Sequence, residues 1–104
     1  MRFRVSWTSE AVEDLLRLHD FLIHRALEHG TSLDLADEGI AAIEHAVLLL
    51  ETSPFSCRKA AQNPFLRELV IPFGATGYVA LFEISNAHQV TVAAVRHQRE
   101  SDYH

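Results

Sequence analysis

Two adjacent segments with helical periodicity constrain the fold of this chain most strongly. In residues 11–27, and again in residues 33–50, apolar side chains recur at spacings of three and four. Such spacing places them on one face of a helix. Gly30 lies between the two segments, where a helix C-terminus needs it, and Ser9 is expected to cap the first helix. The short connection predicts an antiparallel helical hairpin.

Strand patterns fill the rest of the chain. They cover residues 1–7, 67–71, 78–84 and 90–95, and the segment from Pro54 to Pro64 is expected to be a loop. The element order is therefore strand, helix, helix, strand, strand, strand. We expect a single α+β domain over residues 1–104, with two layers, in which the helical hairpin packs on one face of an antiparallel sheet.

Composition narrows the class of protein. Hydrophobic residues make up 48% of the 104 residues, which excludes a disordered chain. No apolar run reaches the roughly 18 residues that a membrane-spanning helix needs, and the first residues resemble a strand rather than a secretion signal. Cys57 is the single cysteine, so an internal disulfide is excluded and a reducing, cytoplasmic location is expected.

The charge of the chain is unevenly distributed. The net charge is −5, but residues 8–53 contain ten acidic and two basic side chains, and the remaining residues contain seven basic and four acidic ones. Six of those seven basic residues are arginines, which suit planar, bidentate contacts. We therefore expect an acidic half and a basic half, with the basic half available for a macromolecular target.

The C-terminal segment from residue 96 to residue 104 is the main candidate site. It follows an apolar strand and contains two guanidiniums, two imidazoles and a phenol, groups that contact phosphate, nucleobases or an acidic protein face. The alternative is a solvated chain end without function. Arg58 and Arg67 are further candidates. Arg67 begins its strand and Arg96 ends its own, so the sequence leaves open whether these cations cluster.

No metal site or cofactor is predicted. His19, His24 and His29 are spaced by five residues, which turns each about 140° from the last on a helix of roughly 3.6 residues per turn. They cannot converge on one ion, and no cysteine or carboxylate pair completes a recognisable site. Surface histidines are expected instead.

A series of short motifs resembles toxins of the RelE/ParE superfamily of type II toxin–antitoxin systems. The motifs are VSWTSEA at residues 5–11 followed by Asp14-Leu15, Pro54 followed by Cys57-Arg58-Lys59, RELVIPF at 67–73, GYVALF at 77–82 and AVRHQRE at 94–100. No single motif is specific, but their order spans nearly the whole chain. The similarity is greatest to the ParE, plasmid-stabilisation branch.

The resemblance implies a small cytoplasmic toxin that halts growth and is silenced by a cognate ParD-like antitoxin whose C-terminal segment wraps it. In the ParE branch the target is DNA gyrase, no catalysis is known, and nucleic acid is contacted only indirectly. The expected target contacts are Arg58, Arg67, Arg96, His97, Arg99, Tyr103 and His104. A basic, apolar antitoxin segment is expected to lie across the acidic helices and to contact Asp14, Leu15, Leu18 and Leu22.

The RelE branch supplies the alternative, a ribosome-dependent mRNA endoribonuclease. Metal-independent cleavage of RNA needs an acid, a base and cations around the phosphate. The residues that would serve are Arg67, His97, Arg99 and Tyr103. With one lysine and an acidic total charge, the chain matches such an enzyme poorly. A toxin that only binds its antitoxin is a third possibility.

Overall fold

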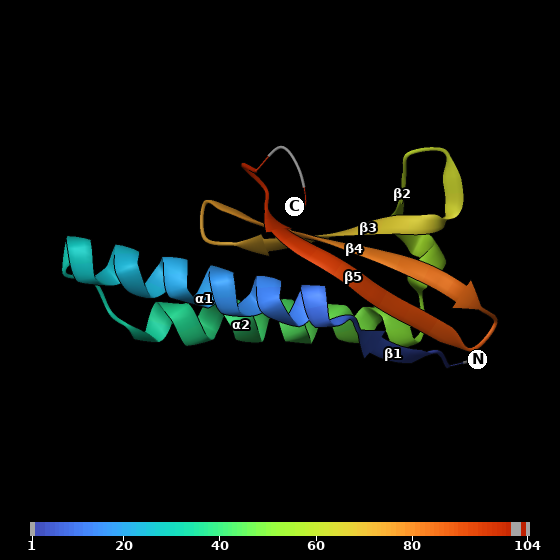
Figure 1. Cartoon of the computed structure of the whole chain (residues 1–104), viewed down its shortest axis with the longest axis horizontal. Helices are drawn as coiled ribbons and strands as arrows, with labels where there is room; N and C mark the ends of the chain where they lie inside the picture. The colour runs from blue at the N-terminus through green and yellow to red at the C-terminus, as the bar shows by residue number, and fades with distance from the viewer. Residues whose placement is uncertain (1, 101–102, 104) are drawn as a thin grey trace.

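The computed structural model describes residues 2–100 and 103, and it has a helical layer on one face of a sheet (Figure 1). The elements in chain order are β1 (Arg4–Trp7), α1 (Ser9–His29), α2 (Asp34–Val47), the 3₁₀ turns η1 (Leu48–Glu51) and η2 (Pro54–Ser56), β2 (Arg58–Ala60), β3 (Asn63–Phe73), β4 (Thr76–Asn86) and β5 (Gln89–His97). Within the described residues the strands form one five-stranded sheet in the order β1-β5-β4-β3-β2. The predicted α+β class and the helical hairpin are confirmed.

Two details of the sheet differ from expectation. β1 pairs with β5 in parallel, so that Arg4 lies opposite Gln89, and the sheet is mixed rather than antiparallel. The predicted loop after Pro54 contains β2, which pairs with β3 and places Arg58 opposite Glu68. An alternating pattern shows that a strand has one buried face, but it carries no information about the direction of its neighbour.

The ends of α1 are fixed by side-chain and backbone caps. The Thr8 hydroxyl accepts a hydrogen bond from the Ala11 amide at 3.1 Å and donates one to the Ala93 carbonyl at 3.0 Å. Thr8 is therefore the N-cap, and the expectation for Ser9 is wrong by one residue, because Thr8 alone also reaches β5. Gly30 ends the helix in the left-handed conformation, with φ of 65°.

The core lies between the helices and the inner face of the sheet. Ile43 and Leu50 from the helical layer and Phe82 and Val92 from the sheet are fully buried. Gly39 allows α2 to approach closely, since a Cβ at this position would lie 2.8 Å from Leu22 Cδ1 and 3.1 Å from the Tyr78 hydroxyl. The sequence therefore has a glycine at the point where α1, α2 and β4 meet.

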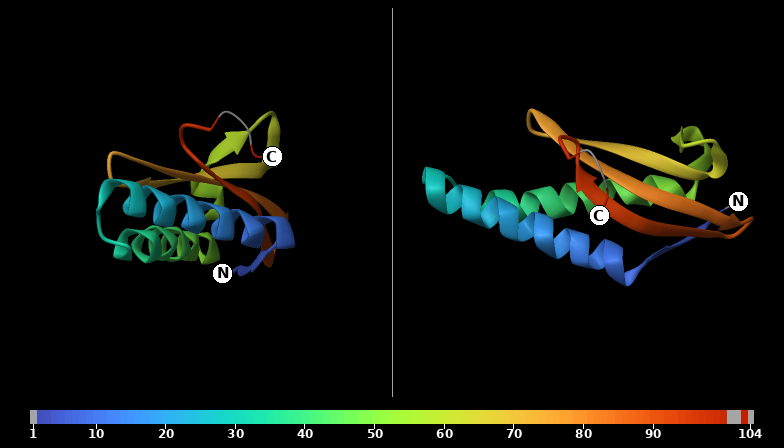
Figure 2. Two further views of the ribbon diagram at one scale, coloured as in Figure 1. Left: turned by 60° about the vertical axis from the view of Figure 1, so that its left-hand side comes forward. Right: turned by 45° about the horizontal axis from the view of Figure 1, so that its top comes forward.

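The helical hairpin is displaced along the long axis of the molecule relative to the sheet. The molecule measures 46 × 25 × 24 Å, and the α1–α2 connection extends beyond the turn between β3 and β4 (Figures 1 and 2). This overhang leaves apolar side chains such as Phe21 and Leu27 more than half exposed. None of the helices in the described part of the chain combines the length and hydrophobicity needed to cross a bilayer.

Candidate functional site

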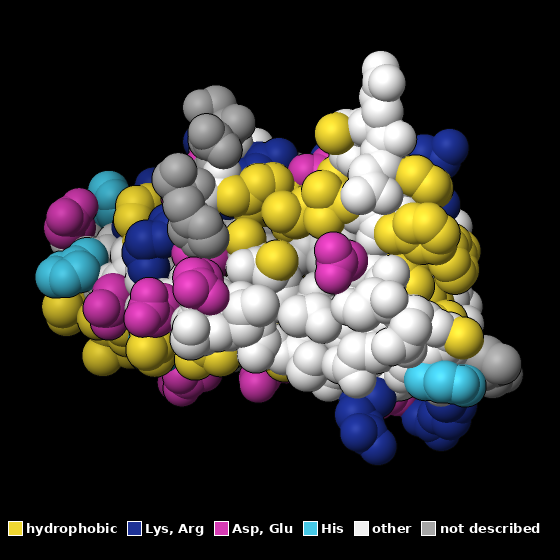
Figure 3. All heavy atoms as spheres, turned by 45° about the vertical axis from the view of Figure 1, so that its right-hand side comes forward, with side chains coloured by type: hydrophobic (Ala, Val, Ile, Leu, Met, Phe, Trp, Pro, Cys, Tyr) yellow, Lys and Arg dark blue, Asp and Glu magenta, His cyan; other side chains and the backbone are white. Residues whose placement is uncertain are grey.

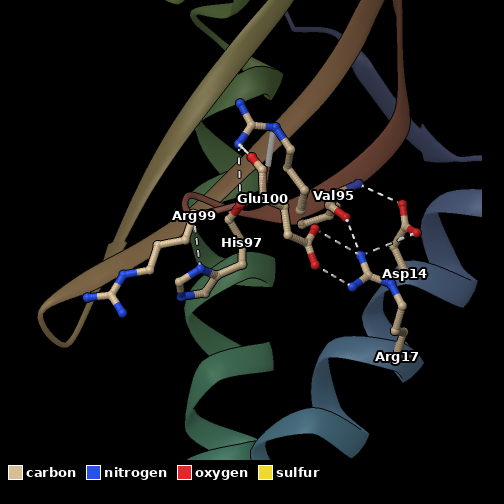
Figure 4. Close-up of polar contacts among 7 residues, drawn as sticks. Asp14, Arg17, Val95, His97, Arg99 and Glu100 are labelled. Atoms are coloured by element: carbon tan, nitrogen blue, oxygen red, sulfur yellow. Dashed lines mark hydrogen bonds and ion pairs between the residues drawn. The ribbon is translucent and has the colours of Figure 1, made fainter. Parts of the chain in front are cut away.

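The C-terminal end of β5 is fastened to α1 by a buried carboxylate (Figure 4). β1 ends opposite Val92, so the edge of β5 beyond this point lacks a strand neighbour among the described residues. Asp14 of α1 takes the place of one, because its Oδ2 accepts a hydrogen bond from the Val95 amide at 2.8 Å. Asp14 is 3% exposed. Its role is to hold the helix against the strand.

Arg17 extends this connection to the residues after β5. Its guanidinium donates to Glu100 Oε1 at 2.7 Å and to the Val95 carbonyl at 3.4 Å, and it lies 3.9 Å from the Asp14 carboxylate. The charge of Arg17 is thus balanced within the fold. Together Asp14 and Arg17 fix where the C-terminal segment leaves the sheet.

Four residues gather on the outer face of the sheet, opposite the helices, and form what we call the Glu68 cluster: Arg58, Glu68, Arg96 and Tyr103. Arg58 Nε donates to Glu68 Oε1 at 3.0 Å, the Tyr103 hydroxyl donates to Glu68 Oε2, and Arg96 Nη2 lies 3.9 Å from the same carboxylate. Burial, reinforced by the hydrogen bond to Glu68, raises the pKa of Tyr103 well above its ordinary value. The phenol is therefore neutral and acts as a donor.

Arg96 is the centre of the Glu68 cluster. Its side chain is only 14% exposed, and its guanidinium lies 4.9 Å from the centre of the Tyr103 ring. Nη1 donates to the carbonyl of Glu100 at 2.7 Å and, at longer distances, to those of His97 and Gln98. Arg96 therefore shapes the C-terminal turn, and its assignment as a target contact stays a prediction.

Arg67 is likewise used within the fold. Its guanidinium donates to the carbonyls of Phe55, Cys57 and Pro64 at 3.0, 2.7 and 2.8 Å, and it lies 5.2 Å from the centre of the Phe55 ring. Three carbonyl acceptors and a ring face occupy the guanidinium. Within the fold, Arg67 therefore clamps the loop before β3, and its assignment as a target contact stays a prediction.

A cleft of about 730 Å³ lies between α1 and the turn that joins β3 to β4, and we call it the helical-end cleft. Its apolar lining includes Phe21 and Leu22 from α1 and Phe73 from β3. Its polar lining includes His97 and Arg99. The cleft exists because the helices overhang the sheet at this end.

His97 is held in one orientation at the inner end of this cleft. Its Nδ1 accepts from the Arg99 amide at 3.1 Å, which makes Nε2 the protonated nitrogen, and Nε2 lies 2.9 Å from the Thr76 hydroxyl. The ring packs edge-on against Tyr78, with centroids 5.8 Å apart. Burial, followed by the nearby Arg99 charge, lowers the pKa of His97 below 6.5, so the imidazole is neutral at pH 7.

Two cations of the cleft lack an acidic partner within the described residues. Arg25 makes no ion pair with a described residue and lies 5.8 Å from the centre of the Phe21 ring, and Arg99 is seen to donate only its backbone amide, to His97. Both are exposed. Glu100, the nearest carboxylate in sequence, is engaged by Arg17. The cleft therefore carries uncompensated positive charge.

The predicted target contacts are thus divided among separate places. Arg58, Arg96 and Tyr103 meet at Glu68 on the outer face, His97 and Arg99 lie at the helical-end cleft, and Arg67 lies in the loop clamp. His104 lies outside the described residues. The set proposed for ribonuclease chemistry is separated in the same way. Adjacent strand residues point to opposite faces, which is why Arg96 and His97 serve different regions.

The predicted antitoxin contacts differ in their exposure, and they stay a prediction. Asp14 and Leu18 are buried in the fold, whereas Leu15 and Leu22 are partly exposed. The sequence does not show which side of a wide apolar stripe a sheet covers. Arg25, absent from the predictions, follows Arg17 and Phe21 at spacings of four, which places all three on one face of α1. That spacing could have identified the cleft. No comparable spacing in the sequence indicates the role of Glu68.

No group of three or more His, Cys, Asp or Glu side chains is arranged to hold an ion anywhere in residues 2–100 or at Tyr103. Burial also raises the pKa of the Cys57 thiol, which disfavours a thiolate.

Comparison with known proteins identifies relatives of the chain. A family model described as the ParE toxin of the type II toxin–antitoxin system parDE matches residues 5–102. Among solved structures, a chain of the chromosomal ParDE toxin–antitoxin system from P. aeruginosa superimposes with a TM-score of 0.73, at 15% identity, over 92% of this chain and 96% of that one. At that identity the likeness shows a shared fold. No match was found among curated proteins.

Proposed function

Because the chain belongs to the ParE toxin family of type II toxin–antitoxin systems, we propose that it arrests growth by inhibiting DNA gyrase and that a cognate ParD-like antitoxin silences it. The family match over residues 5–102 carries this proposal. Gyrase acts on DNA in the cytoplasm, so the toxin is proposed to act there and to meet nucleic acid through the enzyme.

The arrangement of side chains favours binding over catalysis. Metal-independent RNA cleavage needs an acid, a base and phosphate-binding cations around one phosphate. His97 is close to Arg99 but is tied to Thr76, Arg67 is occupied by backbone carbonyls, and Tyr103 donates to Glu68. These groups do not surround a common space, which supports an inhibitor that acts by contact.

The C-terminal turn remains the proposed target contact, with a narrower set of residues. Arg99 is exposed beside the helical-end cleft, and Arg58 is exposed on the outer face although it is paired with Glu68. The turn that presents Arg99 is held in place from both sides, by Arg17 through Glu100 and by Arg96 through the carbonyls. A preorganised cation of this kind loses little entropy when it binds.

The antitoxin is proposed to cover the overhanging part of α1 and the cleft beside it. Phe21, Leu16 and Leu27 expose 51%, 63% and 64% of their surface, and Leu15 and Leu22 are partly exposed next to them. Exposed apolar groups this numerous on one helix are typical of a protein–protein interface. Covering Phe21 and Leu22, which line the cleft together with Arg99, would also hide Arg99 from the target.

A supercoiling assay tests the proposed function. The purified chain, added to gyrase and relaxed plasmid, should block supercoiling and increase cleaved DNA, and added antitoxin should restore activity. Arg4→Gln, which changes an exposed arginine on β1, is the matched control and should still inhibit. Normal supercoiling at excess toxin would contradict the proposal.

Two parallel measurements separate the alternatives. Toxin-dependent cuts in a defined mRNA on translating ribosomes, lost in His97→Ala, would establish the ribonuclease instead. Expression of the chain without growth arrest would show that it only binds its antitoxin.

A further inference from the structure

The helical-end cleft combines a concave shape with two arginines that have no ion pair in the described residues. Arg25 enters it from α1 and Arg99 from the C-terminal turn, and both guanidiniums lack a carboxylate partner there. By contrast, Arg2, Arg17 and Arg58 each pair with a glutamate at 2.6, 2.7 and 3.0 Å. Arg4 and Lys59 are also exposed without an ion pair in the described residues, but neither lines the cleft, whereas Arg25 and Arg99 both do.

The floor of the cleft is apolar. Phe21 is half exposed, and Leu22, Leu35 and Phe73 lie around it. The Arg25 guanidinium lies 5.8 Å from the centre of the Phe21 ring, a distance at which a cation interacts with an aromatic face. An occupant therefore meets a hydrophobic surface and two positive groups together.

We propose that the helical-end cleft binds a segment of the antitoxin that carries an aspartate or glutamate beside a large apolar side chain. The carboxylate pairs with Arg25 and Arg99, and the apolar side chain packs against Phe21 and Phe73. This inference rests on the proposed silencing by an antitoxin and specifies the chemistry of the segment. It differs from the expectation of a basic segment, which was based on the acidic helices as a whole, because the cleft is lined by Arg25 and Arg99 and the Asp14 carboxylate is buried and bonded to Val95.

A protein carboxylate fits the cleft better than a nucleic-acid backbone does. Figure 3 shows acidic side chains along the helical end of the molecule, with Lys and Arg side chains among them and at the opposite end. The net charge is −5, and ten acidic residues lie within residues 8–53. A polyanion approaching this end is repelled over its length, whereas a single carboxylate reaches the two arginines locally.

His97 supports this assignment by its surroundings. The groups that face it are Arg25 from α1, Arg99 and Glu100 from the C-terminal turn, and Tyr78 from β4. The two arginines disfavour the protonated imidazole. A carboxylate placed between them offsets that repulsion, so His97 reports on whether the site is filled.

Calorimetric titration with the purified antitoxin tests the proposal. Arg25→Gln and Arg99→Gln should each weaken binding by roughly tenfold or more at low salt, as expected for partly desolvated charge pairs at an interface. Arg4→Gln is the matched control and should bind like the unaltered chain. The same titrations use a second antitoxin in which Asp and Glu side chains of the C-terminal segment are replaced by Asn and Gln. The arginine substitutions should lose most of their effect against it.

Three other outcomes would decide against the proposal. Equal affinities of all three variants for the antitoxin would overturn the carboxylate assignment while leaving antitoxin silencing intact. Failure of the unaltered chain to bind antitoxin would overturn both. Binding of a short DNA duplex that is lost in Arg25→Gln and Arg99→Gln, without any effect on antitoxin, would assign the cleft to nucleic acid instead.

Discussion

The Glu68 cluster and the helical-end cleft both use arginines of the C-terminal motif, but in opposite ways. In the cluster, Arg96 is surrounded by backbone carbonyls, a carboxylate and the Tyr103 ring. In the cleft, Arg99 is exposed, and no ion pair to it is seen in the described residues. Two arginines three positions apart therefore have different roles. One stabilises the fold, and the other is available to a partner.

The difference follows from strand geometry and from the offset of the helices. Arg96 projects from the outer face of β5, where the C-terminal turn folds over it. Arg99 follows the strand and lines the helical-end cleft, beside which the hairpin extends beyond the sheet (Figure 4). An arginine is paired with acceptors where the chain folds back over it, as at Arg96. It has no such partner where the chain does not fold back, as at Arg99.

The largest expected effect is on stability, from Arg96→Met. The substitution removes the donor to three carbonyls and one cation from Glu68, and it should lower the free energy of unfolding by about 3 kcal/mol. Urea-induced unfolding measures this value. Arg99→Met, the matched control, should change it by less than about 0.5 kcal/mol. Equal losses of unfolding free energy in the two variants would show that Arg96 in the Glu68 cluster and Arg99 in the helical-end cleft do not differ in their role in the fold.

Asp14→Ala should have the next largest effect. It leaves the Val95 amide without its acceptor at the edge of β5, and we expect a loss of about 2 kcal/mol. Glu13→Ala changes the adjacent exposed carboxylate and should change stability by less than about 0.5 kcal/mol. Thermal or urea unfolding of both variants checks the difference. A similar loss in Glu13→Ala would show that charge on α1, rather than the bond to Val95, matters.

Tyr103→Phe should cost about 1 kcal/mol, because the hydroxyl donates to Glu68. The fold raises the pKa of Tyr103, so its contribution is present below pH 10, the ordinary value, and is lost as the pH rises above it. The stability difference between Tyr103→Phe and the unaltered chain should therefore shrink above pH 10. A constant difference up to pH 11 would show that the phenol does not act as a donor.

The smallest expected effect concerns His97. Its NMR titration midpoint should lie below 6.5, and its contribution to stability should be present above pH 6.5 and lost as the pH falls below that value. Arg99→Gln removes one of the charges that lower the pKa of His97 and should therefore move the midpoint upward. Arg4→Gln should leave it unchanged. A midpoint that does not respond to Arg99→Gln would show that Arg99 does not act on this imidazole.

The sequence predicted the layers of the fold more fully than the pairing of its strands. Helical spacing in residues 11–27 and 33–50 and alternation in the strands were sufficient to predict a hairpin on a sheet, because each pattern records which side of an element is buried. The parallel pairing of β1 with β5 depends on where the hairpin returns the chain. The strand β2 is three residues long, too short to show a period.

The candidate site was predicted less completely than the fold. The sequence selected the residues after β5 as candidates. It could not show that carbonyl oxygens occupy Arg96 and Arg67, since those contacts depend on how the turn after β5 and the loop before β3 fold around each side chain. It also placed Asp14 at the surface, although the missing strand neighbour of β5 draws this carboxylate inward. Burial of a charge depends on an unpaired backbone group that no local pattern reveals.

Nitrogen-15 NMR of the arginine side chains during addition of antitoxin tests the contrast between the two regions most directly. The Nε signals of Arg25 and Arg99 should shift as the complex forms, while those of Arg67 and Arg96 stay in place because their partners lie within the toxin. Shifts confined to Arg67 and Arg96, with Arg25 and Arg99 unmoved, would contradict the assignment of the cleft as the partner surface.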